Sequence, residues 1–210
     1  MPYITDYLQL KSTFVLEKIY KAMFLTFENA TELYEDAEIL YKNGKIKRSY
    51  TFYHFSFEEG GRFFLLVKVF FKSLLNEIKP FELNYGYLKK NGFEQHIKKL
   101  DESVLKLFAT QVYTSVLQNN TEQTEKLTEM YEELKGRISE FNNLKNRSIY
   151  ISYIENEFTK PSNSITLENV DYMKELAGIQ LINIKQILQR IEKEGSINNL
   201  KTKFVNDNYK

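Results

Sequence analysis

The stretch RSYTFYHFSFEEGGRFFLLVKVFF, residues 48–71, decides the fold, because aromatic and aliphatic side chains fill it almost without interruption. Such a run predicts a helix that is buried on most sides. His54, Glu58 and Arg62 interrupt it at intervals of four residues, so a helix places them on one stripe. Glu59 lies next to this stripe. A buried carboxylate is costly unless it is paired, so we expect Arg62 to pair with Glu58 or with Glu59.

Two adjacent glycines, Gly60 and Gly61, lie inside the same predicted helix. Each glycine costs a helix interior about 1 kcal/mol relative to alanine. The pair therefore predicts either the close approach of another backbone or a kink. We interpret the stretch as a core helix that carries a buried polar cluster. A purely structural network of ion pairs explains the same residues equally well.

The composition bounds the class of protein. The chain has 210 residues, of which 42% are hydrophobic and 27% charged, as in a soluble globular protein. A net charge of +1 argues against a general polyanion binder but allows a small local phosphate-contacting site. The absence of cysteine and the presence of two histidines give no basis for a metal site, and we expect no cofactor. No signal peptide and no long apolar run occur, so we expect a cytoplasmic protein without a membrane partner.

Helical periodicity along the chain predicts an all-α fold, an antiparallel bundle of about five long helices. We expect a helical lead-in over 1–27, the bundle over 28–195 and a polar, frayed tail over 196–210. The expected helices of the bundle cover about 28–43, 46–78, 93–118, a heptad-patterned segment from 121 onwards, and 166–194. The segments 80–92 and 155–166 are expected to be loops, and no segment predicts a strand.

Three groups of polar side chains on different predicted helices are candidates for a site, because helical bundles often build sites from facing residues. In chain order they are His54, Glu58, Glu59 and Arg62; His96 and Lys99; and Lys145, Arg147, Tyr150 and Tyr153. From the sequence alone, a solvated helix end is the simpler explanation of the second group. A di-iron carboxylate site is not expected, since Glu-x-x-His pairs on two helices are missing.

Taken together, these residues resemble the AbiV family of bacterial abortive-infection proteins. The resemblance covers roughly residues 28–185 and agrees in both order and spacing. The positions that carry it are Asn29-Ala30, Asp36-Ala37, Leu40 to Gly44, Glu58 to Arg62, His96-x-x-Lys99, Lys145 to Tyr153, Pro161 and Ile165-Thr166. Arg62 stands where the family usually has lysine, which keeps the positive charge.

The resemblance implies a HEPN-like helical bundle, a homodimer, and a toxin-like antiphage effector that stops the growth of an infected cell by cleaving RNA or blocking translation. It also implies a phage-encoded activating protein and an RNA substrate as partners. HEPN ribonucleases usually place arginine, a polar residue, a short spacer and histidine at the start of a late helix. Arg147-Ser148 occupies a comparable place, but Ser152, Tyr153 and Ile154 follow where histidine is expected. An Arg-x5-His spacing does occur at Arg48 and His54, in the middle of the aromatic helix.

The missing histidine leaves open whether the protein is an enzyme. If it is a metal-independent ribonuclease with an altered motif, Tyr153 or His96 replaces the histidine. Our hypothesis assigns His96 as acid and base, and Arg147 and Lys99 as stabilisers of the phosphate. Glu59, with Arg62, would orient these groups. His54, Glu58, Arg62, Lys145 and Tyr150 form the structural polar cluster of this hypothesis. The alternative is a non-catalytic module that recognises a phage or host protein.

Overall fold

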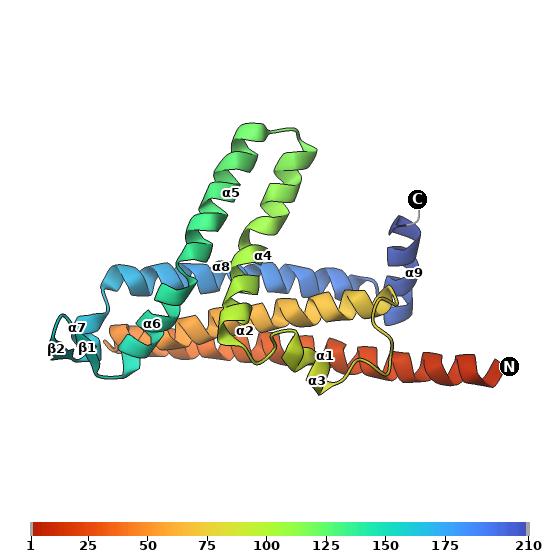
Figure 1. Cartoon of the computed structure of the whole chain (residues 1–210), viewed down its shortest axis with the longest axis horizontal. Helices are drawn as coiled ribbons and strands as arrows, with labels where there is room; N and C mark the ends of the chain where they lie inside the picture. Colours follow the sequence, from red (N-terminus) through yellow and green to blue (C-terminus); the bar gives the residue numbers. More distant parts are fainter. Residues whose placement is uncertain (1, 209–210) are drawn as a thin grey trace.

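The computed structural model describes residues 2–208, with side chains described for 16–161 and 163–203. The predicted all-α class is confirmed, with one small β-hairpin in addition (Figure 1). Helices α1 (Pro2–Lys42), α2 (Ile46–Leu74) and α8 (Leu167–Lys193) lie side by side and form the body of the bundle. In the described part of the chain, no helix is both long enough and apolar enough to cross a membrane.

Helix α2 is the centre of the packing, as its aromatic sequence predicts. It contacts α1, α8, α4 (His96–Leu117) and α6 (Ile138–Ile149). Its first half contributes Tyr53 and Phe57 to one hydrophobic cluster, and its second half contributes Phe63 and Phe70 to another. All four of these rings have no exposed surface. The helix therefore contributes to both cores, as do α1 and α8.

The two glycines of α2 lie where neighbouring helices come closest. A Cβ atom on Gly61 would lie 1.8 Å from the carbonyl oxygen of Lys99 in α4. A Cβ atom on Gly60 would lie 2.2 Å from Oε1 of Gln180 in α8. Real Cβ contacts do not become so short, so only glycine permits the backbone contact at Gly61, whereas at Gly60 the end of the Gln180 side chain would have to move. The close approach expected from the sequence is confirmed.

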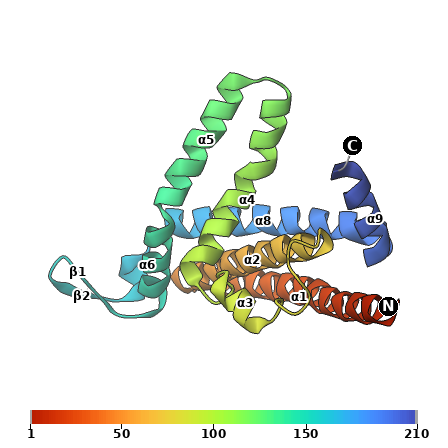
Figure 2. The same ribbon diagram turned by 45° about the vertical axis from the view of Figure 1, so that its right-hand side comes forward.

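Helices α4 and α5 (Thr121–Gly136) form an arm that projects away from the bundle (Figures 1 and 2). The buried side chains of α4 lie between Lys99 and Leu107, with Ser115 beyond them, so only the first part of the helix is packed on the body. The heptad-patterned segment predicted from 121 onwards is interrupted at Gly136–Arg137, and α6 then returns to α2.

The first helix is longer than the sequence analysis predicts. A lead-in followed by a helix over 28–43 was expected, but α1 is one uninterrupted helix that ends at Lys42. No proline or glycine occurs between Tyr3 and Asn43, so nothing stops the helix before Gly44, which has a φ of +76°. The predicted loop 80–92 contains the short helix α3 (Tyr85–Lys90), because the Asn84 side chain accepts a hydrogen bond from the Tyr87 amide and caps it.

The prediction that the chain has no strand is wrong. Strands β1 (Ser152–Ile154) and β2 (Glu157–Thr159) form an antiparallel hairpin, followed by the short helix α7 (Pro161–Ser164). The turn residues Glu155 and Asn156 both have positive φ, at 50° and 67°, which is the geometry of the tight turns that favour hairpins. Strands of three residues are too short to show an alternating pattern in the sequence.

The end of the chain is also more ordered than expected. Thr166 begins α8 with a capping box that includes Asn169, as predicted for a cap at this threonine. Gly195, with a φ of +74°, follows the end of α8, in agreement with the predicted stop. The tail predicted as frayed contains helix α9 (Ile197–Asn208), whose Leu200 is buried. Met1 and residues 209–210 of the predicted lead-in and tail lie outside the described residues.

Candidate active site

The polar centre of the protein is the carboxylate of Glu58, in the middle of α2. Its side chain is 5% exposed and accepts two hydrogen bonds on Oε1. Lys99 Nζ lies 2.5 Å from this oxygen and His96 Nδ1 lies 2.7 Å from it. His96 and Lys99 are three residues apart in the first turn of α4, so both reach the same face of α2. The close approach of α4 to Gly61 brings the first turn of α4, with His96 and Lys99, within reach of Glu58.

The charge of Glu58 is held by its partners. Burial raises the pKa of the Glu58 carboxyl, but the hydrogen bond and charge of Lys99, together with those of His96, outweigh burial and lower the pKa below its ordinary value. Glu58 is therefore ionised at neutral pH. The Lys99 side chain is 3% exposed, so its charge serves Glu58 and does not face solvent.

His96 is the exposed member of this group. Its side chain is 58% exposed, although its Nδ1 is held by a buried carboxylate. With Nδ1–H donating to Glu58, Nε2 is the ring nitrogen left for a ligand. A histidine oriented in this way by a carboxylate can take up a proton from a reacting group and return it, since the carboxylate stabilises the imidazolium.

Of the two pairings that the sequence leaves open for Arg62, the structure contains the one with Glu59. Arg62 Nη1 lies 2.9 Å from Oε1 of Glu59, whereas the pairing of Arg62 with Glu58 is not formed. The Arg62 guanidinium also lies 5.0 Å from the centre of the Phe93 ring, three residues before His96. Glu58 therefore orients His96, and Glu59 holds Arg62. A catalytic role for Glu59 stays a prediction.

His54 is part of the same cluster but is closed to any substrate. It has no exposed surface, and neither ring nitrogen has a hydrogen-bond partner among the described residues. Burial is the main cause that lowers the pKa of His54, to about 3. The charge of Glu58 raises this pKa, and the nearby charges of Lys145, His96 and Lys99 lower it. His54 is therefore neutral at physiological pH. Because Arg48 is exposed and His54 is sealed, the Arg48–His54 spacing does not form a catalytic pair.

The third predicted group lies on α6 and in the hairpin, and α6 contacts the first part of α2. Lys145 is buried, donates to Asn142 Oδ1 at 2.7 Å and lies 5.8 Å from the centre of the Phe55 ring. Ser148 shares a short hydrogen bond with Thr51. Thr51 and Glu58 are seven residues apart on α2, which corresponds to about 10 Å along a helix.

Arg147, Tyr150 and Tyr153 therefore do not join His96 within one chain. Arg147 is half-buried, and the two tyrosines are each 64% exposed. The structure thus brings together Glu58, His96 and Lys99, with His54 and Lys145 beside them. It leaves the last part of the predicted set at the end of α6 and in the hairpin, and the catalytic roles of these residues stay predictions.

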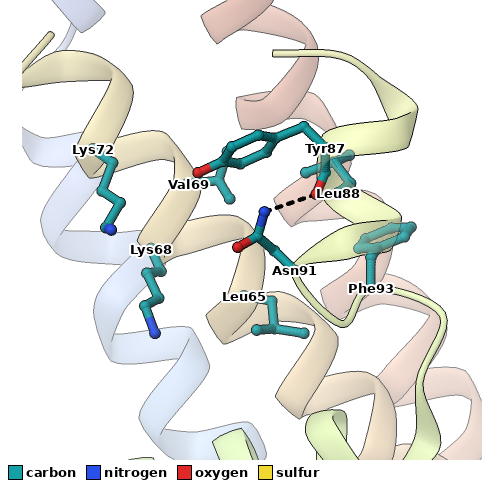
Figure 3. Close-up of a pocket in the computed structure, with 8 residues that line it drawn as sticks. All are labelled: Leu65, Lys68, Val69, Lys72, Tyr87, Leu88, Asn91 and Phe93. Atoms are coloured by element: carbon teal, nitrogen blue, oxygen red, sulfur yellow. Dashed lines mark hydrogen bonds between the residues drawn. The ribbon is translucent and has the colours of Figure 1, made fainter. Parts of the chain in front are cut away.

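A small pocket next to Phe93 does not extend the site. Figure 3 shows it between α2 and α3, where Lys68 and Lys72 face Tyr87 and Asn91. Its volume is about 50 Å³, whereas small-molecule sites usually measure about 300–1,000 Å³. It is too small for a nucleotide. Within the described residues, no three histidine, aspartate or glutamate side chains gather in a way suited to a metal ion.

The fold and the site define the class of protein, an all-α bundle with a buried carboxylate that orients an exposed histidine. The comparison with known families then shows the family. The family model HEPN_AbiV, described as AbiV, matches residues 18–181, so the chain belongs to the AbiV family of HEPN proteins. This membership, which confirms the resemblance found in the sequence, indicates a role in abortive infection, a form of phage defence. Searches of curated proteins and of solved structures gave no match.

Proposed function

We propose that this AbiV-family protein stops the growth of infected cells by attacking RNA, with His96 as the acid and base. The observation that carries the proposal is the contact of His96 Nδ1 with the buried Glu58, which leaves an exposed imidazole with an oriented Nε2. An exposed histidine held in this way is suited to proton transfer.

The chemistry requires no group beyond the chain and the RNA. His96 Nε2 takes the proton of a 2′-hydroxyl, and the 2′-oxygen forms a bond to the adjacent phosphorus. The bond from phosphorus to the 5′-oxygen breaks, and the imidazolium returns the proton to that oxygen. The products are a 2′,3′-cyclic phosphate and a 5′-hydroxyl. Glu58 stays ionised and stabilises the imidazolium, while Lys99 acts as a positioning residue that keeps Glu58 ionised.

The phosphate also needs a cation as its charge grows. Arg62, one helical turn from Glu58, is the first candidate; its Nη1 pairs with Glu59, and its Nε is buried without a hydrogen-bond partner among the described residues, so Arg62 would have to turn outward to reach a phosphate. Arg147 remains the second candidate, and in the homodimer that family resemblance implies it would come from the other copy. Co-expression tests this point, because a heterodimer of His96→Ala and Arg147→Ala chains retains one intact shared site. Restored toxicity supports a shared site, and continued inactivity excludes it.

The proposal is tested by expressing variants in cells challenged with phage and by incubating purified protein with total RNA. We expect His96→Ala to abolish cell killing and RNA cleavage while the helical circular dichroism is retained. Asp101→Ala, an exposed change in the same helix, is the matched control and should keep both activities. If His96→Ala kills cells as well as the parent, the proposal is wrong.

A second candidate function is a non-catalytic module that binds a phage or host protein. The observation that favours it is an apolar hollow of about 440 Å³ on the projecting arm, with Val116 and Tyr113 on its rim, 53% and 64% exposed. Contiguous exposed apolar surface often marks a protein contact. Under this reading Val116→Asp abolishes protection while His96→Ala retains it, which is the reverse of the result expected for the enzyme. A phage-encoded activator of the enzyme would instead make both changes inactivating.

A further inference from the structure

The concave surface beside the α1–α2 turn carries an unbalanced positive charge. It has a volume of about 660 Å³ and is lined by residues 44–48, by Ile149 and Ile151, and by Lys160 and Pro161. Four of these lining residues are cationic, namely Lys45, Lys47, Arg48 and Lys160, and none is acidic. None of the four forms an ion pair within the described part of the chain. We call this surface the basic groove.

An exposed pair of aromatic rings stands next to the basic groove. Tyr153 and Phe158 face each other across the hairpin, with ring centres 5.1 Å apart, and are 64% and 82% exposed. Figure 2 shows the hairpin standing out beyond α6. Large rings exposed to this extent on a short hairpin contribute little to a core, so their position is not explained by folding.

The register of the hairpin places these rings on the side of the groove. Ser152 pairs with Thr159, and Ile151 and Lys160 are the next residues outward, just beyond the two strands. Side chains two residues apart along a strand point to the same face. Tyr153 and Phe158 therefore share the face of Ile151 and Lys160, which line the basic groove. Glu157 pairs with Ile154 and points to the opposite face.

We propose that the basic groove and the Tyr153–Phe158 pair together bind single-stranded RNA. The cations contact the phosphates, and the two rings stack on unpaired bases. The groove has the volume of a site for one or two nucleotides. The chain as a whole carries a net charge of only +1, so the positive charge of this surface is a local feature. The aromatic pair favours unpaired bases over a duplex, whose bases are already stacked.

This inference deepens and rests on the proposed attack on RNA, but it can fail or hold independently of it. The groove borders the end of α6 and the start of α2, whereas His96 lies at Glu58, further along α2. The groove would therefore hold nucleotides other than the one whose phosphate reacts at His96. The groove supplies affinity, and it gives Tyr153 a role in binding RNA.

The test is fluorescence anisotropy with a labelled single-stranded RNA oligonucleotide and the full-length His96→Ala protein, which removes cleavage from the measurement. We expect Lys47→Ala with Lys160→Ala, one change on each wall, to weaken binding about tenfold at low salt. The slope of log affinity against log salt concentration should fall by about 1.4, since each phosphate contact in a single strand contributes about 0.7. Lys126→Ala with Lys193→Ala removes the same charge from exposed positions elsewhere and is the matched control.

A second variant tests the rings without changing the charge. Phe158→Ala should weaken binding to the single strand about tenfold and leave binding to a duplex of the same sequence unchanged. The inference is overturned if the two groove lysines behave like the control pair, or if anionic lipid vesicles bind the groove and RNA does not. Binding through the groove by a protein whose His96 proves dispensable would retain this inference and reject the catalytic assignment.

Discussion

Replacing Lys99 with methionine removes the cation that balances the buried carboxylate of Glu58 while filling almost the same volume. Glu58 then keeps only His96 as a polar partner, although its side chain is 5% exposed. Loss of one partner from a buried ion pair typically costs about 3–5 kcal/mol, because the remaining charge is left without compensation. Since His96 still donates a hydrogen bond, we expect a loss near the lower end, about 3 kcal/mol in the free energy of unfolding.

The loss should depend on pH. In the parent, the folded-state pKa of Glu58 is lowered, so its stabilising contribution is present above the ordinary carboxyl pKa and is lost as pH falls through the folded value. In Lys99→Met the main cause that lowers the pKa of Glu58 is gone, and burial therefore raises this pKa. Protonation then relieves the buried charge as pH falls. The deficit relative to the parent should therefore be largest near neutral pH and should shrink in mild acid.

Urea unfolding followed by far-ultraviolet circular dichroism, at about pH 7.5 and about pH 5, measures both quantities. The double variant Glu58→Gln, Lys99→Met is the control, because it removes both charges and leaves an amide in place of the acid. We expect it to recover most of the stability, to within about 1 kcal/mol of the parent. The reasoning is refuted if Lys99→Met is as stable as the parent at neutral pH, or if the double variant is no better than the single one.

Four further substitutions test other parts of the fold. Gly61→Ala should destabilise the protein by about 3 kcal/mol or more in urea, because its new methyl group meets the α4 backbone, whereas Gly136→Ala, with open space around it, should gain about 0.5–1 kcal/mol. His54→Leu should stabilise the protein, and more so in acid. Burial lowers the pKa of His54 to about 3, so its imidazole stays neutral in the folded parent, whereas in the unfolded chain it gains a proton below about pH 6.5. The parent therefore loses stability as pH falls between these two values. At about pH 5 this difference adds about 2 kcal/mol to the gain, which thermal unfolding at two pH values detects; an equal gain at both would contradict it. Thr166→Ala should lower the free energy of unfolding by about 1 kcal/mol through loss of the α8 cap, and an unchanged midpoint would exclude a role for the cap.

The packing around α2 could be predicted from the sequence because its residues are unusually aromatic and include two adjacent glycines. A long aromatic run has few places in a soluble protein other than a core, and paired glycines in such a run have few uses other than close packing. The ends of the helices at Gly44 and Gly195 followed from glycine's access to positive φ. The hairpin could not be predicted, because three-residue strands and a Glu-Asn turn leave no periodic signal.

Which of Glu58 and Glu59 pairs with Arg62 could not be predicted from the sequence. The two are adjacent in the sequence, and either can pair with Arg62 by spacing alone. A usable signal was present, since His54, Glu58 and Gly61 share one helical face and Gly61 marks the face approached by α4. The position of Arg147 relative to His96 depends on how α6 returns to α2 after the break at Gly136, which spacing along the chain does not determine.

The arm made by α4 and α5 has one anchored end and one free end. Helix α4 is packed on the body from Lys99 to Leu107, and residues 108–117 extend beyond this contact by about 15 Å at 1.5 Å per residue. A swing of about 5° about Leu107 displaces the tip by about 1.3 Å and leaves the first turn of the helix in place. The tip of the arm can thus meet another molecule while His96 keeps its contact with Glu58.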